Sequence, residues 1–332
     1  MSSQPTSAVR RSRPFVAVAF GVLAGTIVAL VALAFLWPVA TSEAHDLPVG
    51  VVGGQLPSSA DLPVEPTSYD TRADAVQAIL DRELYGAFIL DADGPEVLVA
   101  SADGPATVSV LEGVGDELAS AQGAVLITTD LVPLPGGDPV GAGMSAMGFP
   151  IVLGGILGGV LVSLLVAGVA RRLLALVVYA AVGGFLVAVA TGPLLGILVG
   201  HFWIEALVLG AGMLGTASTV VGLNALLGTP GLAVGAVITM LIGNPISGAT
   251  LPYQFIAGPW GAIGQYFVPG AAASLVREVN HFPEASTLHA WTVLLAWTLA
   301  GVVLSLLGHF RSSTPVHLPE RELEQPVGAH LA

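Results

Sequence analysis

The sequence predicts an α-helical membrane protein in which six transmembrane helices carry a small α/β extracellular domain between the first and second helix. Of the 332 residues, 54% are hydrophobic and 10% are charged, with a mean hydropathy of +0.83, values that soluble domains do not reach. No charged residue occurs between Glu205 and Arg277, a run long enough for more than one crossing of about 20 residues. Residues 38–147, in contrast, hold 17 of the 23 acidic residues.

The first predicted transmembrane helix covers residues 14–37. It follows a cytoplasmic N-terminal segment, 1–13, that contains three arginines, and it ends at Trp37, where an interfacial aromatic residue is expected. A signal peptide cleaved after Ala44 is the alternative. The apolar stretch of about two dozen residues exceeds the roughly 7–15 of a signal peptide, so we expect a retained span.

Five further apolar segments predict the rest of a transmembrane domain over residues 148–309. They lie at about 148–170, 173–199, 203–227, 231–250 and 288–309. Arg171 and Arg172 separate the second and third spans, and Arg311 begins a cytoplasmic tail, 310–332. Because arginine-rich loops stay in the cytoplasm, both termini are expected inside and residues 38–147 outside.

The extracytoplasmic segment 38–147 shows the alternation of strands and helices that predicts a small α/β domain. Strands are expected near 47–54, 85–91, 96–101 and 123–129, and helices at 71–84 and 106–122, the first capped by Thr71. The acidity of this segment argues against a nucleic-acid partner. Asp91, Asp93 and Asp103 lack the spacing of a calcium loop.

Two absences of residue types exclude several kinds of chemistry. All ten basic residues are arginine and there is no cysteine, which excludes a Walker lysine, a Schiff base and a thiolate nucleophile. The usage of arginine with abundant Ala, Gly and Val is typical of a bacterial genome rich in G and C. We expect no enzymatic activity and no metal or cofactor on this chain, because no nucleophile, base and orienting group occur together.

The stretch "GNPISGAT", 243–250, interrupts the fifth apolar segment. Pro245 removes a helical hydrogen bond and biases Asn244 away from helical angles, so the helix should end near Gly243. Broken backbone at membrane depth must be sheltered by protein or water, and residues 251–287 are expected to form re-entrant or interfacial helices. The candidate outer gate comprises Asn244, Pro245, Ser247, Gly248, Gln265, Tyr266, Pro269 and Gly270.

The order of these parts resembles the YhgE/Pip-like and ABC-2-type permease group. The resemblance rests on "LPVGVVGGQ", "ADAVQAILDRELYGAFILD", "GTPGLAVGAVITMLIGNPISGATLP" and "IGQYFVPGAAASLVREV", and it covers nearly the whole chain. It implies a permease half that pairs with an identical or related copy and with a separate ATPase, which would hold the ATP. The chain departs from the group in having only about thirteen residues before the first span, where a coupling helix is common.

Glycine motifs within the spans are expected to serve helix packing. "GAGMLG", 210–215, has the letters of a dinucleotide fingerprint, but neither a strand nor the acidic residue that the fingerprint requires accompanies it. Gly21 with Gly25, and Gly154, Gly155, Gly158 and Gly159, have the spacing that lets helices approach closely.

Polar residues near the spans have both structural and functional interpretations. One polar set in the fourth span has two interpretations: its members line a pathway, or they form hydrogen bonds between helices. The set comprises Thr216, Ser218, Thr219 and Asn224. Glu205, beside Trp203, is expected to be interfacial and hydrated. Arg277 is expected to anchor the last outer helix by packing or snorkelling. His201, His281 and His289 lack metal-ligand spacing and are expected at the surface.

The resemblance therefore implies an export permease subunit of the bacterial plasma membrane, moving a hydrophobic or amphipathic substrate through the lipid bilayer with energy from a partner ATPase. The alternative is a scaffold or receptor without transport activity, of the phage-infection or secretion-accessory type, which acts through its ectodomain. A membrane enzyme is the third and weakest hypothesis.

Overall fold

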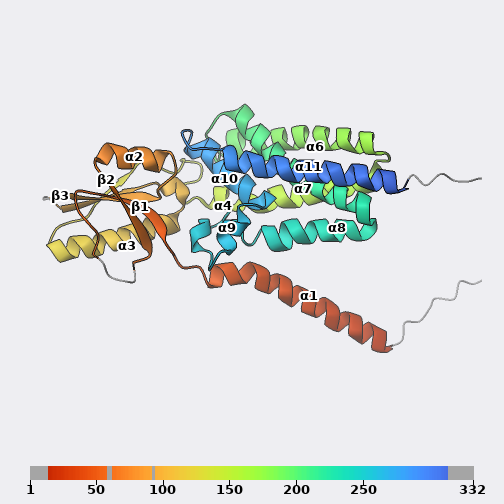
Figure 1. Ribbon diagram of the computed structural model, residues 1–332, viewed down its shortest axis with the longest axis horizontal. Helices are drawn as coiled ribbons and strands as arrows, with labels where there is room; N and C mark the ends of the chain where they lie inside the picture. The colour runs from red at the N-terminus through yellow and green to blue at the C-terminus, as the bar shows by residue number, and fades with distance from the viewer. Residues whose placement is uncertain (1–13, 58–61, 92–93, 313–332) are drawn as a thin grey trace, which may run out of the picture.

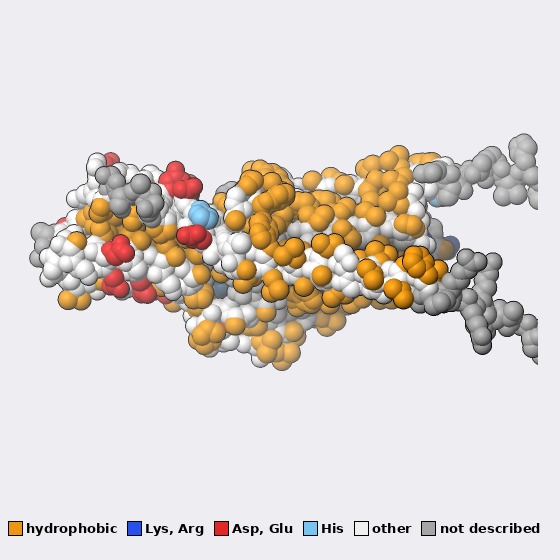
Figure 2. All heavy atoms as spheres, turned by 90° about the horizontal axis from the view of Figure 1, so that it is seen from below, with side chains coloured by type: hydrophobic (Ala, Val, Ile, Leu, Met, Phe, Trp, Pro, Cys, Tyr) orange, Lys and Arg blue, Asp and Glu red, His pale blue; other side chains and the backbone are white. Residues whose placement is uncertain are grey.

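The computed structural model describes residues 14–57, 62–91 and 94–312, which form an elongated molecule with a β-sheet at one end and a helical bundle at the other (Figure 1). Five of its helices are long and apolar enough to cross a membrane. Hydrophobic side chains cover most of the helical part in Figure 2, and acidic side chains gather over the sheet. The chain is thus a mostly helical protein of the multi-pass membrane type.

Helix α7, Phe202–Leu227, is the centre of the bundle. In its most apolar stretch 72% of the residues are buried, compared with 22–50% for the three long helices beside it. These neighbours are α5, Gly148–Leu165, α6, Val169–Val189, and α11, Leu288–Ser312. Helix α7 is therefore the buried central helix of the bundle, with apolar and small residues on every side.

Glycines set the distances between these helices. A Cβ on Gly155 would lie 2.5 Å from the Cβ of Thr216, and one on Gly159 would lie 2.8 Å from Val220. Within "GAGMLG", a Cβ on Gly210 would lie 2.7 Å from the carbonyl oxygen of Ala180. The glycines of α5 and α7 therefore pack helices closely, as their spacing predicts.

Helix α1, Pro14–Ala40, stands apart from the bundle except near its C-terminal end (Figure 1). No residue in its most apolar 18-residue stretch is buried. Gly21 and Gly25 have no atom within 4 Å of an added Cβ. The prediction that these two glycines pack against another helix is therefore wrong for the described residues of this chain, because no helix of the chain approaches them.

The fifth apolar segment is shorter than the expected span of 231–250. It consists of eight α-helical residues, α8, Thr229–Ala236, and seven π-helical residues, η3, Val237–Gly243. At 1.5 Å per residue this is about 22 Å, less than the roughly 30 Å of a hydrocarbon core. The helix ends at Gly243, as Pro245 predicts. The expected departure of Asn244 from helical angles is wrong, because Asn244 has φ −71° and ψ −43° and continues the helical turn by one residue. Helix α6 likewise continues into a π-helical turn, η2, Ala190–Leu194. The helical segment thus ends at Leu194, earlier than the predicted boundary at 199.

A five-stranded sheet lies in the chain between α1 and α4, Ala142–Ala146. Its order is β2-β1-β3-β4-β5, and only the β3–β4 pair is antiparallel. The strands are β1, Leu47–Val52, β2, Val64–Tyr69, β3, Gly86–Asp91, β4, Gly94–Val99, and β5, Ile127–Asp130. Strand β2 is absent from the sequence prediction. It is an exposed edge strand that contains Pro66, and edge strands tolerate proline and polar residues.

One helix covers each face of the sheet. Phe88 and Val97 pack against α3, Pro105–Gln122, while Ala87 and Ile89 face α2, Arg72–Leu80. Thr71 caps α2 by accepting a hydrogen bond from the Asp74 amide at 3.1 Å, as predicted. We call the sheet with α2, α3 and the short η1, Ser101–Asp103, the sheet layer.

The segment between η3 and α11 forms short helices at the end of the bundle that meets the sheet layer (Figure 1). They are η4, Tyr253–Phe255, α9, Trp260–Gly264, and α10, Val268–His281. Phe255 completes the core on the α3 face of the sheet, and Phe282 completes the core on the α2 face. The sheet layer and the helical bundle therefore share both hydrophobic cores.

Candidate functional site

The Asn-Pro-Ile-Ser-Gly break, 244–248, is sheltered by hydrogen bonds from the protein. Ser247 Oγ donates to the Asn244 carbonyl at 2.7 Å and accepts from the Ala249 amide at 3.2 Å. Gln265 Nε2 donates to the Ser247 carbonyl at 2.9 Å, and Ser274 Oγ donates to Gln265 Oε1 at 2.8 Å. The carbonyls of Asn244 and Ser247 and the amide of Ala249 thus have side-chain partners within the protein.

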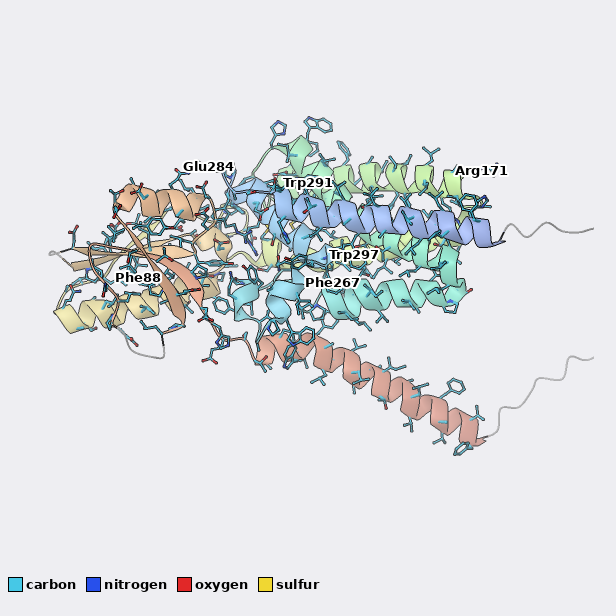
Figure 3. The ribbon with its side chains drawn as sticks, viewed as in Figure 1. Phe88, Arg171, Phe267, Glu284, Trp291 and Trp297 are labelled. Carbon is cyan, nitrogen blue, oxygen red and sulfur yellow. The ribbon has the colours of Figure 1, made fainter. Side chains whose placement is uncertain are left out.

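Close backbone contacts explain the glycines of this region. An added Cβ on Gly264 would collide with the Ile246 carbonyl, and one on Gly270 would collide with the Gly264 carbonyl. Pro269 stands at the start of α10, where its missing amide costs nothing. The break, α9 and the first turn of α10 therefore form one closely packed unit. Tyr266 extends that unit, since its carbonyl accepts from Trp297 Nε1 at 2.8 Å; Trp297 and Phe267 are labelled in Figure 3.

A cavity of about 200 Å³ lies between the break and the C-terminal end of α1. We call it the α1 cavity. Most of its lining is apolar, with Phe35, Val39 and Phe149 among the side chains. The Asn244 side chain also lines it, and its Oδ1 is buried without a hydrogen-bond partner among the described residues. The cavity thus combines an apolar wall with one unsatisfied amide.

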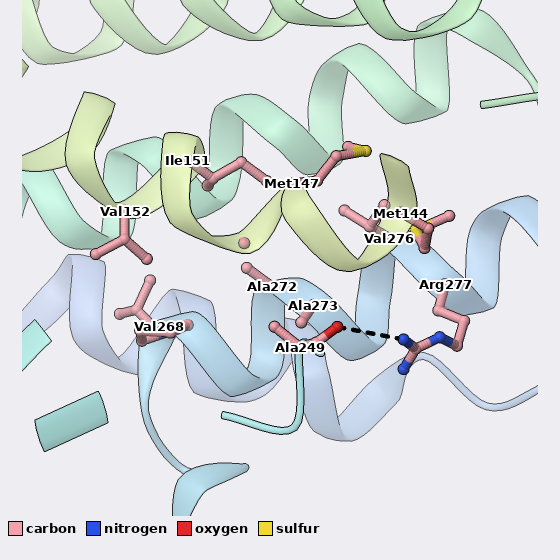
Figure 4. Close-up of a pocket in the computed structure, with 12 residues that line it drawn as sticks. Met144, Met147, Ile151, Val152, Ala249, Val268, Ala272, Ala273, Val276 and Arg277 are labelled. Atoms are coloured by element: carbon pink, nitrogen blue, oxygen red, sulfur yellow. Dashed lines mark hydrogen bonds between the residues drawn. The ribbon is translucent and has the colours of Figure 1, made fainter. Parts of the chain in front are cut away.

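The candidate gate residues do not all meet in one space. Asn244, Pro245, Ser247 and Gly248 line the α1 cavity, whereas Gln265 and Tyr266 line a separate cleft against the sheet layer. Pro269 borders a third space of only about 10 Å³, which has room for about one water molecule. Figure 4 shows that this small space is closed in by Met147, Ile151 and Val268.

Arg277 lies in the protein interior. Its side chain is 5% exposed, and Nη2 donates to the Ala249 carbonyl at 3.5 Å (Figure 4). The expectation of an anchor that snorkels to the headgroups is therefore wrong, because α10 packs between the bundle and the sheet layer and its arginine has no path outward. Burial, and then the neighbouring charge of Arg82, lower the pKa of Arg277.

Two further residues are more buried than expected. Glu205 is 3% exposed in the first turn of α7, and its Oε1 has no hydrogen-bond partner among the described residues, so the prediction of a hydrated side chain is wrong. The loop at Gly200 covers it. His281, expected at the surface, is 8% exposed because α10 ends beneath the sheet layer. His201 and His289 are exposed, as expected.

Of the four candidate polar residues on α7, three form hydrogen bonds within their own helix or its C-terminal cap. Ser218 donates to the Leu214 carbonyl at 2.6 Å and Thr219 to the Gly215 carbonyl at 2.8 Å. Asn224 donates to the Gly228 carbonyl at the end of the helix, and the Thr216 hydroxyl is buried without a partner among the described residues. Within the described chain, Ser218 and Thr219 form no hydrogen bond to another helix.

A buried ion-pair cluster joins the sheet layer to α10. Arg82, which adopts the left-handed backbone conformation at φ 60°, donates to Asp103 at 3.1 Å and to Glu278 at 3.2 Å. The side chains of Arg82 and Glu278 are 14% and 12% exposed, and that of Asp103 is fully buried. A non-glycine residue with positive φ is strained. The strain coincides here with the residue that connects the two parts.

The charged groups in this cluster shift one another's pKa. Burial alone would lower the pKa of Arg82, but Asp103 and Glu278 raise it above its ordinary value. Burial raises the pKa of Glu278, and Arg82 opposes that effect. Sequence reasoning missed Arg82 and Asp103. The sequence did contain one signal for Arg82. It is one of only two arginines in residues 38–147, a segment with 17 acidic residues.

Two other contacts cross the same boundary. Tyr85 Oη donates to Gln254 Oε1 at 2.7 Å, and Gln77 Nε2 donates to Glu284 Oε2 at 2.6 Å. Glu284 is labelled in Figure 3 at the point where the sheet layer meets the bundle. The sheet layer is therefore held by polar contacts to both η4 and the loop after α10.

Comparison with protein-family models, characterised proteins and solved structures finds no match to this chain. The resemblance to the ABC-2-type and YhgE/Pip-like permeases therefore stays a prediction from the sequence. Within the described residues, no group of three or more histidine or acidic side chains is placed to hold a metal ion.

Proposed function

We propose that the chain is a six-pass subunit of an export permease in the bacterial plasma membrane, with the sheet layer outside the cell. The arrangement of charges supports this orientation. Arg171 lies at the end of the bundle far from the sheet, where α1 begins and α11 ends (Figures 1 and 3). Positively charged ends stay in the cytoplasm. In this arrangement the short helix α8 with η3 is the fifth crossing.

The observation that carries the proposal is the position of the break beside the α1 cavity. A helix of about 22 Å ends before a hydrocarbon core of roughly 30 Å does, so Asn244 lies at membrane depth. Interrupted backbone at that depth occurs where it is buried in protein or lines a cavity. Broken helices of this kind form substrate sites in transporters.

The composition of the α1 cavity suggests its ligand. Its apolar lining suits a hydrocarbon group, and the unsatisfied Asn244 amide suits a hydroxyl or other polar group. The cavity lies beside α1, whose side chains otherwise face outward. An amphipathic molecule that enters from the bilayer would meet both features.

A complete transporter would need further chains. The exposed α1 is available to a second, identical or related copy. The chain has no lysine for a phosphate-binding loop, so nucleotide hydrolysis would belong to a separate ATPase on the cytoplasmic side.

The experiment is purification of the complex from native membranes after cross-linking. We expect an ATPase to co-purify and its hydrolysis to rise with a long-chain alkylphosphocholine. Replacing 244–248 by five alanines should abolish that rise, because a continuous helix would close the break. The matched control is L161A/L164A/L165A, three exposed side chains on α5, which should keep it. If no ATPase cross-links to the wild-type chain, the exporter proposal fails.

A scaffold or receptor is the second candidate, and the short cytoplasmic connections favour it. Only residues 166–168 separate α5 from α6, and only Gly228 separates α7 from α8. These connections offer little surface to an ATPase, whereas the sheet layer is a large folded surface. In that case the alanine replacement of 244–248 should leave the capture of partners by the sheet layer unchanged, and cross-linking should recover an extracytoplasmic protein instead of an ATPase.

A further inference from the structure

A cleft of about 470 Å³ separates the sheet layer from the end of the bundle. It is distinct from the α1 cavity, on which the export proposal rests, although the candidate gate residues Gln265 and Tyr266 line it. Its volume falls within the roughly 300–1,000 Å³ of small-molecule sites. Both parts of the molecule contribute to its walls, so a ligand in the cleft would contact the sheet layer and α10 at the same time. We call it the domain cleft.

The charge of the domain cleft is negative. Asp81, Glu83 and Glu278 line it, and Arg82 is the one arginine in the lining. The guanidinium of Arg82 is already engaged by Glu278 Oε1 and by the buried Asp103. Its positive charge is therefore compensated by a carboxylate outside the cleft. An anionic ligand would meet repulsion from three carboxylates.

Glu278 offers an unused acceptor. Its Oε2 is buried and has no hydrogen-bond partner among the described residues, although its Oε1 accepts from Arg82. A buried acceptor without a donor is unfavourable, and a donor that reaches it recovers the lost energy. A positively charged N–H group forms the strongest such bond, because the bond is charge-assisted.

Aromatic rings complete the lining. Tyr85, Tyr253 and Tyr266 border the cleft, and the latter two are 37% and 64% exposed. Tyr266 meets His289 edge to face at a centroid distance of 5.0 Å, which fixes the ring beside the opening. Tyrosine rings attract organic cations over their faces.

We propose that the domain cleft binds a ligand that carries an organic ammonium group. The ammonium N–H donates to Glu278 Oε2, and the carbon groups next to the nitrogen pack on the tyrosine rings. The site requires neither transport nor an ATPase, so it stands independently of the export proposal.

The test is calorimetric titration of the full chain in dodecyl maltoside micelles with 2-phenylethylamine at pH 7. We expect saturable binding. The uncharged 2-phenylethanol and the anionic 3-phenylpropionate have similar size and should bind at least about tenfold more weakly, because neither forms the charge-assisted bond. Equal affinity for the alcohol would overturn the assignment of an ammonium ligand.

Variants locate the site. E278Q should weaken 2-phenylethylamine binding about tenfold or more. Y266L should also weaken it; the Tyr266 side chain is largely exposed and only its backbone carbonyl bonds to Trp297, so this variant should fold even if E278Q does not. E284Q is the matched control. Glu284 crosses the same boundary, to Gln77, but does not line the cleft. Absence of saturable binding, or binding unchanged in both E278Q and Y266L, would overturn the proposal.

A second arm distinguishes two sources of the ammonium group. The titration is repeated in mixed micelles that contain phosphatidylethanolamine or, for comparison, phosphatidylglycerol. Weaker amine binding with phosphatidylethanolamine alone assigns the site to a lipid headgroup, and unchanged binding assigns it to a free amine. Either result supports the site only if E278Q or Y266L also weakens 2-phenylethylamine binding.

Discussion

The guanidinium of Arg82 in the sheet layer lies 3.2 Å from the carboxylate of Glu278 on α10. Because Arg82 also pairs with the fully buried Asp103, one side chain connects η1, the end of α2 and helix α10. Breaking one partner of a buried ion pair leaves uncompensated charge and costs about 3–5 kcal/mol. The position of the sheet layer on the bundle should therefore depend strongly on Arg82.

R82Q should loosen the boundary between the sheet layer and α10. We expect amide hydrogen exchange at 278–287 to speed up by at least about a hundredfold, since roughly 1.4 kcal/mol corresponds to a factor of ten. R72Q is the control. Arg72 pairs with Glu96 at 2.8 Å but its side chain is 46% exposed, so its loss should change exchange less than about fivefold. Similar exchange in the two variants would show that the buried cluster does not hold the parts together.

The main divisions of the fold were predictable from the sequence. Uncharged apolar runs located the long helices, and Thr71 and Pro245 located a helix start and a helix end. The buried cluster was not predictable. Arg82, Asp103 and Glu278 are far apart in the chain, and only the docking of α10 beneath the sheet layer brings them together. Hydropathy also predicted Glu205 and Arg277 at an interface, and both are buried. The polarity of a residue does not show whether segments distant in the sequence will cover it.

Acidification should weaken the same boundary through His281. Burial, and then the charge of Arg277, lower the pKa of His281 in the folded protein. The opened chain therefore binds the proton first. Stability is full above a pH of about 6.5, the ordinary histidine value, and is lost as the pH falls through the lowered pKa. Opening at 278–287 should increase by up to about tenfold per pH unit.

The control for this pH effect is a pair of variants. H281Q should remove the weakening on acidification below about 6.5, whereas H289Q, at an exposed position, should keep it. Glu278 acts in the opposite direction, because burial raises its pKa. Its contribution is fully present below the unfolded-state pKa and is lost as the pH rises through the raised pKa. Hydrogen exchange corrected for intrinsic rates between pH 7.5 and 5.5 makes the measurement, and a slope unchanged in H281Q contradicts the assignment.

Close glycine contacts between α7 and α11 should limit substitution there. An added Cβ on Gly222 would collide with the carbonyl of Gly301. G222A should therefore cost about 1–3 kcal/mol through overpacking, seen as a melting temperature in detergent lower by about 5 °C. G25A places its Cβ in open space and should be neutral or slightly stabilising, because alanine favours helix. Equal melting temperatures for G222A and the wild type would contradict the observed helix distance.

Labelling of single cysteines in intact cells tests the central claim most directly, namely that the break and the sheet layer lie on the outer side of the membrane. The chain has no cysteine, so each introduced thiol reports alone. Thr67 on β2, Thr250 after the break and Arg171 at the far end of the bundle are exposed. We predict that a membrane-impermeant maleimide labels T67C and T250C in intact cells and R171C only after permeabilisation. Labelling of R171C in intact cells, with T67C and T250C protected until permeabilisation, would contradict the account.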